Sequence, residues 1–76
     1  MAEKATLFFE FESGEEHVRG EQNLIPSVGD TVVLHLKDDK HRAGIVESID
    51  WHYYSSDEDS VESVEVYIVL QDIEWP

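Results

Sequence analysis

The chain has 76 residues, of which eighteen are Asp or Glu and five are Lys or Arg, so its formal net charge at pH 7 is −13. A chain this short forms one domain and buries only about 60–65% of the surface that it exposes when unfolded, which argues against an enzyme with its own cofactor cleft. The acidity argues against direct binding to nucleic acid or anionic lipid. A hydrophobic content of 41% is too high for a disordered acidic tail. The sequence therefore predicts one folded acidic domain over residues 1–76.

The first predicted element is a β-strand over residues 6–12, where apolar and acidic side chains alternate with a period of two. Ser13-Gly14 ends this strand. The polar stretch 15–27 is expected to be a long loop with room for one helical turn. The apolar residues on one face of the strand are Leu7, Phe9 and Phe11, and the acids on the other face are Glu10 and Glu12.

Two further strands are predicted in the middle of the chain. The turn at 28–30 leads into a strand over 31–36, and the polar residues 37–41 have the length of a hairpin connection. A third strand follows over about 42–51. Gly44 lies inside that strand, where a glycine indicates a bulge or a close approach of two backbones.

The last strand is predicted over about residues 62–71, where Val64, Val66, Ile68 and Leu70 alternate strictly with more polar residues. The third strand ends in the segment 52–60, which contains the most acidic loop. The segment 73–76 is expected to add an edge strand or to fold over the end of a barrel. The sequence therefore predicts an all-β fold, either a single small antiparallel sheet or an SH3-like barrel of four to five strands.

The segment 26–49 resembles the KOW-type segment of small SH3-like barrels. It has a Gly-Asp turn before a strand, a charged hairpin, and a glycine early in the returning strand. The resemblance implies an SH3-like barrel, whereas the RNA contact made by basic KOW modules is not expected, because no Lys or Arg follows Arg42. The matching positions are Gly29, Asp30, Val32, Leu34, Lys40, Gly44, Val46 and Ile49.

The negative charge is distributed unevenly along the sequence. Residues 1–42 contain nine acids and all five bases, whereas residues 43–76 contain nine acids and no base. Residues on one face of a strand are spaced by about 6.6–6.8 Å, so Glu10 and Glu12 are expected to present carboxylates at a spacing close to that of phosphates along a nucleic-acid strand. The acids of the second half are Glu47, Asp50, Asp57, Glu58, Asp59, Glu62, Glu65, Asp72 and Glu74.

This combination of size, acidity and β-structure is similar to that of phage-encoded inhibitors that imitate DNA, such as some anti-CRISPR proteins and the uracil-DNA glycosylase inhibitor. No diagnostic motif is shared with any of them. The alternative is that the acidity only keeps a small protein soluble and monomeric.

The aromatic run Trp51-His52-Tyr53-Tyr54 lies where the third strand ends, just before the acidic loop. Trp51 is expected to close the end of the barrel. Tyr53 and Tyr54 are adjacent in a strand and cannot both point inward, so at least one of them is expected to be exposed. Exposed aromatic side chains often anchor protein interfaces.

Cofactor, metal and catalytic chemistry receive no support from the sequence. There is no cysteine, and the four histidines lack the HxH or HxxxH spacing of metal sites. We therefore expect no cofactor, no metal ion and no enzymatic activity. A secretory signal and an apolar run of about 18–20 residues are also lacking, so the cytoplasm is the expected location.

Two functional hypotheses follow from these patterns. The first is a non-enzymatic inhibitor that occupies the basic groove of a nucleic-acid-binding protein, such as a CRISPR effector subunit or another defence nuclease. The second is a generic SH3-like interaction module, which would bind mainly through Tyr53, Tyr54, Trp75 and the 13–27 loop. The partner-binding residues predicted for the inhibitor are Asp57, Glu58, Asp59, Glu62, Glu65, Tyr53, Tyr54, Glu10 and Glu12.

Overall fold

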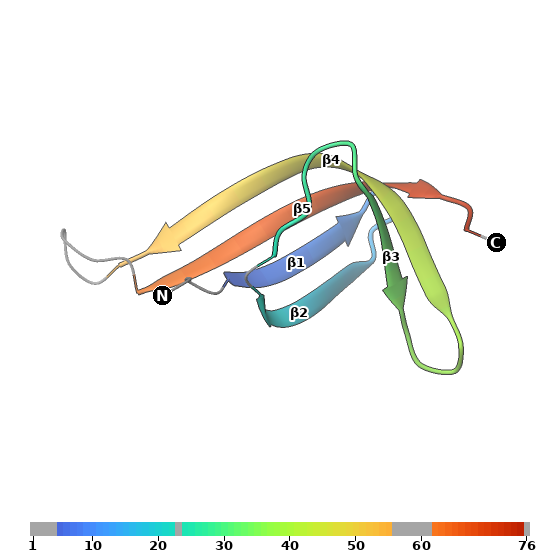
Figure 1. The fold of residues 1–76 in the computed structure, drawn as a ribbon, viewed down its shortest axis with the longest axis horizontal. Helices are drawn as coiled ribbons and strands as arrows, with labels where there is room; N and C mark the ends of the chain where they lie inside the picture. The colour runs from blue at the N-terminus through green and yellow to red at the C-terminus, as the bar shows by residue number, and fades with distance from the viewer. Residues whose placement is uncertain (1–4, 23, 56–61, 76) are drawn as a thin grey trace.

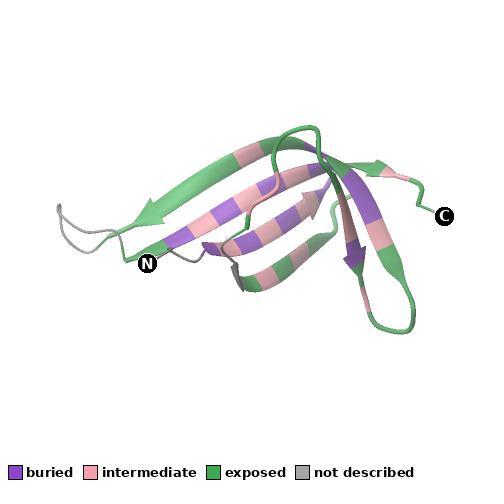
Figure 2. Ribbon diagram, viewed as in Figure 1, coloured by how far each residue is buried: buried purple, intermediate pink, exposed green. Residues whose placement is uncertain are grey.

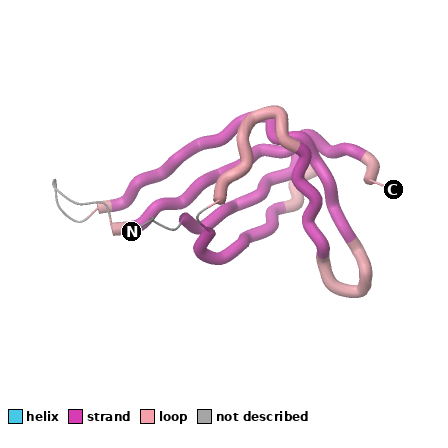
Figure 3. The backbone as a smooth tube through the Cα atoms, in the orientation of Figure 1, coloured by secondary structure: helices cyan, strands magenta, loops and turns pink. Residues whose placement is uncertain are grey.

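The structure, a computed structural model, describes residues 5–22, 24–55 and 62–75. Within these residues the chain forms five strands and no helix (Figures 1 and 3), which confirms the predicted all-β fold. The strands are β1 (Ala5–Phe11), β2 (Glu16–Gln22), β3 (Thr31–His35), β4 (His41–Tyr54) and β5 (Ser63–Ile73).

All five strands belong to one sheet, in the order β2-β1-β5-β4-β3. The sheet is strongly curved (Figure 1), and β2 and β3 form its two edges, so the described strands make a half-barrel. Three of the four strand pairings are antiparallel, but β1 and β5 are parallel. The expectation of purely antiparallel pairing is wrong for this pair, because alternation along a strand carries no information about the direction of its neighbour.

The prediction of a long loop over 15–27 is also wrong, because Glu16–Gln22 is strand β2, paired antiparallel with β1. Polar residues of β2 pair with core residues of β1: His17 pairs with Phe9, and Arg19 pairs with Leu7. Val18 lies on the opposite face and is exposed. An edge strand with this pattern lacks the apolar alternation by which the other strands are recognised.

The expected hairpin between the middle strands is present. Its turn contains Asp38 and Asp39 in left-handed backbone conformation, with φ of 62° and 58°, a conformation that Asp tolerates better than most residues. Strand β4 runs further than expected, to Tyr54, and its register with β5 shifts between Val46 and Ser48. Ile73 extends β5 and pairs with Ala43, so it does not start a separate edge strand.

The hydrophobic core lies on the concave side of the curved sheet, which we call the inner face; the convex side is the outer face. Buried residues alternate along β1 and β5 with partly exposed ones (Figure 2), as the sequence predicted. The connection from β2 to β3 adds Ile25, which packs against this core together with Val32, Leu36 and Ile49. The core residues are Ala5, Leu7, Phe9, Phe11, Leu34, Val46, Val64, Val66, Ile68 and Leu70.

Candidate functional site

The outer face carries four carboxylates from four neighbouring strands. The register pairs Glu10 of β1 with Glu16 of β2, and it pairs Asp50 of β4 with Tyr67 of β5. Glu65 of β5 pairs with Thr6 of β1 on one side and with His52 of β4 on the other. Glu10 and Glu65 alternate with buried residues, so they lie on the convex side. Paired residues share a face of the sheet, so Glu16, which pairs with Glu10, and Asp50, which pairs with Tyr67, lie on the same side.

A row of aromatic rings crosses the outer face between these acids. The rings of Phe8 and Tyr67 stack with centroids 4.7 Å apart and planes at 9°. His52 contacts the Tyr67 ring edge-on, also at 4.7 Å. Tyr54 lies further along the same side of β4 and is exposed. The row therefore extends over β1, β5 and β4.

Glu65 is the acid that contacts this row of rings directly. The Tyr67 hydroxyl donates a hydrogen bond to Glu65 Oε1 at 3.1 Å. Hydrogen bonding to Glu65 is the main reason why the pKa values of Tyr67 and Tyr54 are raised above 10.0, and desolvation adds to both shifts. Glu65 thus accepts hydrogen bonding from phenols on both sides of it in the row.

A further pair of acids lies where β1 ends. Glu12 follows the last residue of β1, and the irregular register of β4 places Glu47 close to it. The pKa of Glu12 is raised, first by a hydrogen bond with the Glu47 carboxyl, and then by repulsion from the Glu47 charge, desolvation and repulsion from Asp72. Carboxylates are therefore crowded at this end of the sheet.

None of the Lys and Arg residues that the structure describes lies on the outer face. Arg19 pairs with Leu7 and Arg42 pairs with Leu34, so both project from the inner face. Lys37 and Lys40 belong to the hairpin between β3 and β4. The charge asymmetry therefore lies between the two faces of the sheet and not only between the two halves of the sequence. Glu10 and Glu16 from the first half lie on the same face as Asp50 and Glu65 from the second.

The structure brings together only some of the residues predicted from sequence. Glu10, Glu65 and Tyr54 lie on the outer face, and Glu12 lies at the end of β1. Glu62 is exposed beside Tyr54, whose carbonyl oxygen accepts a hydrogen bond from the Glu62 N–H at 2.8 Å. The loop acids lie outside the described residues; they are Asp57, Glu58 and Asp59.

Tyr53 and Trp51 are on the inner face, where they pair with Val64 and Val66. Trp51 does not close the end of the barrel as expected, because its side chain is 48% exposed. The reason is that the pairing of β4 with β3 ends at Ile45, and none of the other described strands pairs with that edge of β4 near Trp51. Trp51 instead stacks on Tyr53, with centroids 6.4 Å apart.

Several outer-face residues were not predicted as site residues. The period of two places Phe8 and Tyr67 opposite the core, but only the register shows that they stack. The sequence pattern places Glu16 in a loop, and Asp50 and His52 gain their neighbours only through pairing with β5. No local signal in the sequence identifies these contacts.

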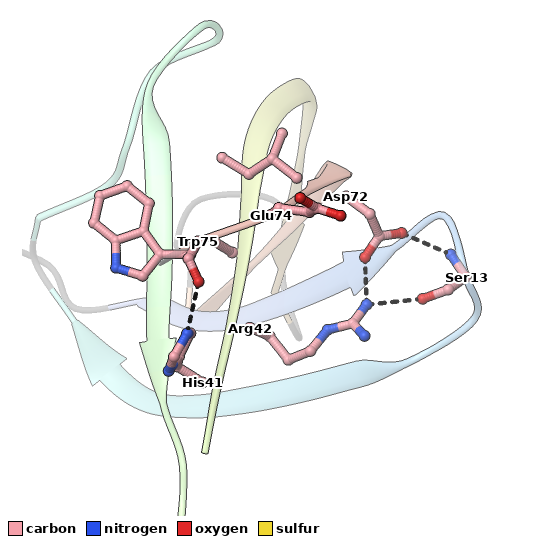
Figure 4. Close-up of a pocket in the computed structure, with 8 residues that line it drawn as sticks. Ser13, His41, Arg42, Asp72, Glu74 and Trp75 are labelled. Atoms are coloured by element: carbon pink, nitrogen blue, oxygen red, sulfur yellow. Dashed lines mark hydrogen bonds and ion pairs between the residues drawn. The ribbon is translucent and has the colours of Figure 1, made fainter. Parts of the chain in front are cut away.

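A depression at the opposite end of β4 is lined by the residues labelled in Figure 4. The Arg42 guanidinium binds Asp72, donates to Ser13 Oγ at 2.9 Å, lies 3.3 Å from Glu15 and covers the Phe11 ring at 4.7 Å. Arg42 therefore fastens the turn between β1 and β2 to β4 and β5. His41 adds a hydrogen bond from Nε2 to the Trp75 carbonyl oxygen at 3.0 Å. The positive charge of Arg42 is therefore paired with carboxylates of the same domain.

The described part of the chain contains no group of three or more His, Asp or Glu side chains arranged to hold a metal ion. It also contains no helix that is long and apolar enough to cross a membrane. Comparisons with protein-family models, with curated proteins and with solved structures gave no match for this chain.

Proposed function

We propose that this domain is a non-enzymatic inhibitor that occupies the positively charged groove of a nucleic-acid-binding protein in place of the nucleic acid. The observation that carries the proposal is the outer face, on which Glu10, Glu16, Asp50 and Glu65 are gathered without any described Lys or Arg. The setting that we favour is phage counter-defence in the host cytoplasm. The partner would then be a CRISPR effector subunit or another defence nuclease.

The shape and spacing of this face suit such a partner. Same-face residues on one strand lie about 6.6–6.8 Å apart, a distance similar to that between successive phosphates along a nucleic-acid strand. A convex sheet can enter a groove that holds a duplex or a single strand. The excess of negative charge would accelerate association and make it sensitive to salt.

The aromatic row gives this surface an anchor. Arginine and lysine side chains are attracted to the faces of aromatic rings, and a basic groove supplies them in number. Tyr54 is exposed at the end of the row, while Tyr67 is fixed by its stacking on Phe8 and its bond to Glu65. A groove side chain could therefore contact a ring and a carboxylate together.

The proposal is tested by competition for labelled DNA. A panel of purified CRISPR effector complexes and defence nucleases is loaded with fluorescent target DNA, and release of that DNA by this protein is measured at 50 and 300 mM NaCl. We expect displacement from at least one panel member and an affinity about tenfold weaker at the higher salt concentration. Failure to displace DNA from any member, or an affinity that does not change with salt, contradicts the proposal.

The panel member that responds is then tested with two variants that each remove three negative charges. E10Q/D50N/E65Q neutralises the outer face, whereas D38N/D39N/E74Q neutralises acids elsewhere, and Asn is tolerated in the left-handed conformation of the hairpin turn. We expect the first variant to lose at least tenfold in affinity and the second to lose less than threefold. Equal losses would mean that only net charge matters.

A second candidate function is an interaction module that binds through apolar contacts, and one observation favours it: Trp51 and Tyr53 are exposed and stacked on the inner face. The two candidates differ in the tyrosine that they use. Tyr54→Ala weakens binding if the outer face is the contact surface, and Tyr53→Ala weakens it if the inner face is. Reversal of the loop acids to Lys, at Asp57, Glu58 and Asp59, should abolish binding only for the charge-based inhibitor.

A further inference from the structure

The two edges of the sheet border an open groove on the inner side of the half-barrel, which we call the seam. Two depressions lie along it and share Arg19 of β2 in their lining. The first, of about 400 Å³, has an apolar wall that includes Phe9, Leu24 and Val32. The second, of about 680 Å³, includes His17, Arg19 and residues of the hairpin between β3 and β4. The seam thus has an apolar part and a polar part in direct succession.

The polar part concentrates the positive charge of a protein that is otherwise strongly acidic. Arg19, Lys37 and Lys40 line it, which are three of the five Lys and Arg residues of the chain, and His35 lies among them. Asp38 supplies the one carboxylate in this lining. Lys37 and Lys40 are exposed and Arg19 is half-buried. An anion that enters this depression can therefore contact all three side chains.

The edges also offer backbone groups. Strands β2 and β3 each have one neighbour in the sheet, so each has a side on which its N–H and C=O groups lack a strand partner. Extended peptides bind to such edges by adding a strand, and side-chain pockets next to the edge then supply specificity.

We propose that the seam binds an extended segment of a partner protein in which a few apolar residues adjoin a short acidic run. The backbone of the segment pairs with β2 or β3, its apolar side chains contact the wall around Phe9 and Val32, and its carboxylates bind Arg19, Lys37 and Lys40. A peptide fits better than a nucleic acid, because the edge requires amide groups and the net charge of −13 repels a long polyanion. This surface is separate from the outer face.

The test is an NMR titration of the full chain with two short peptides, acetyl-Ile-Val-Val-Ser-Asp-Glu-Asp-amide and the peptide of reversed order. We expect at least one of them to bind and to shift the backbone amides of β2 and β3 together with those of residues 36–40. Two variants, R19Q/K40Q and K37Q/K40Q, should each weaken binding at least fivefold while the thermal midpoint stays within a few degrees. The outer-face variant E10Q/D50N/E65Q should bind the peptide unchanged, which keeps this proposal independent of the inhibitor function.

Control ligands identify the occupant. A peptide with Lys in place of its acids should not bind, and N-methylation of alternate backbone amides should abolish binding if a strand is added to the sheet. The proposal is overturned if neither acidic peptide binds, or if the Lys peptide or the N-methylated peptide binds equally well. It is also overturned if the chemical-shift changes are confined to the outer face. If octathymidylate binds equally well, the seam is a general anion site and the peptide proposal is wrong. If the amides of the seam shift with protein concentration alone, the occupant is a second copy of this chain and not a partner protein.

Discussion

Gly44 of β4 and Leu70 of β5 pack so closely that no side chain fits between them. A Cβ placed on Gly44 would lie 2.8 Å from Leu70 Cβ, 2.9 Å from the Gln71 carbonyl oxygen and 3.2 Å from the Phe11 ring. Two of these neighbours are core side chains, and the third is backbone. The two long strands can therefore approach each other here only because residue 44 is glycine.

Gly44→Ala should destabilise the fold by about 2 kcal/mol, because an added methyl group in a closely packed core forces the neighbouring strands apart. In a domain of this size that corresponds to a fall in the thermal midpoint of about 10 °C. Gly20→Ala is the matched control, since its Cβ would meet nothing within 4 Å, and its midpoint should stay the same or rise slightly. Thermal unfolding followed by circular dichroism measures both, and similar values for the two variants would refute the close approach at Gly44.

Arg42→Met should destabilise the fold by about 1–2 kcal/mol. The substitution removes the ion pair with Asp72, the hydrogen bond to Ser13 and the contact of the guanidinium with the Phe11 ring. Partly exposed ion pairs contribute little on their own, whereas the cation over the ring adds to them. Lys40→Met is the control and should change the free energy of unfolding, measured in urea, by less than about 0.5 kcal/mol. Equal effects of the two substitutions would mean that the Arg42 contacts do not stabilise the fold.

Glu47→Gln should stabilise the protein at pH 7 and return the pKa of Glu12 towards its ordinary value of 4.5. The pKa of Glu12 is raised in the folded state by Glu47, so the folded state holds this proton more tightly than the unfolded state does. The resulting stabilisation is complete below pH 4.5 and is lost as the pH rises through the raised pKa. A Glu12 carboxyl titration by ¹³C NMR and thermal midpoints at pH 4 and pH 7 test this, with Glu74→Gln as the control for net charge. An unchanged Glu12 titration would contradict it.

Glu65→Ala should lower the pKa values of Tyr67 and Tyr54 towards 10.0. Both are raised mainly by hydrogen bonding to Glu65. A raised phenol pKa means that this contact stabilises the fold below about pH 10 and that its contribution is lost as the pH rises through the shifted values. An ultraviolet titration at 295 nm, assigned with Tyr67→Phe and Tyr54→Phe, follows the two groups. If the titration curve of Glu65→Ala matches that of the parent protein, Glu65 is not the cause.

The sequence by itself determined the strands whose two faces differ. Alternation along β1 and β5 identified their buried residues, and the turn residues located the hairpin between β3 and β4. These patterns are local: a strand turns successive side chains to opposite faces, so one half-buried strand can be recognised without its neighbours. The total charge and the lack of any Lys or Arg after Arg42 are likewise properties of the sequence.

Only the tertiary structure decided which residues act together. Strand β2 lacks apolar alternation, so its pairing with β1 left no periodic signal. The parallel pairing of β1 with β5 joins segments about sixty residues apart. That pairing places Phe8 on Tyr67, while Arg19 and Arg42 project from the inner face. Register and strand order are set by long-range packing of the core. Because of them, the charge difference along the sequence appears in the fold as a charge difference between the two faces of the sheet.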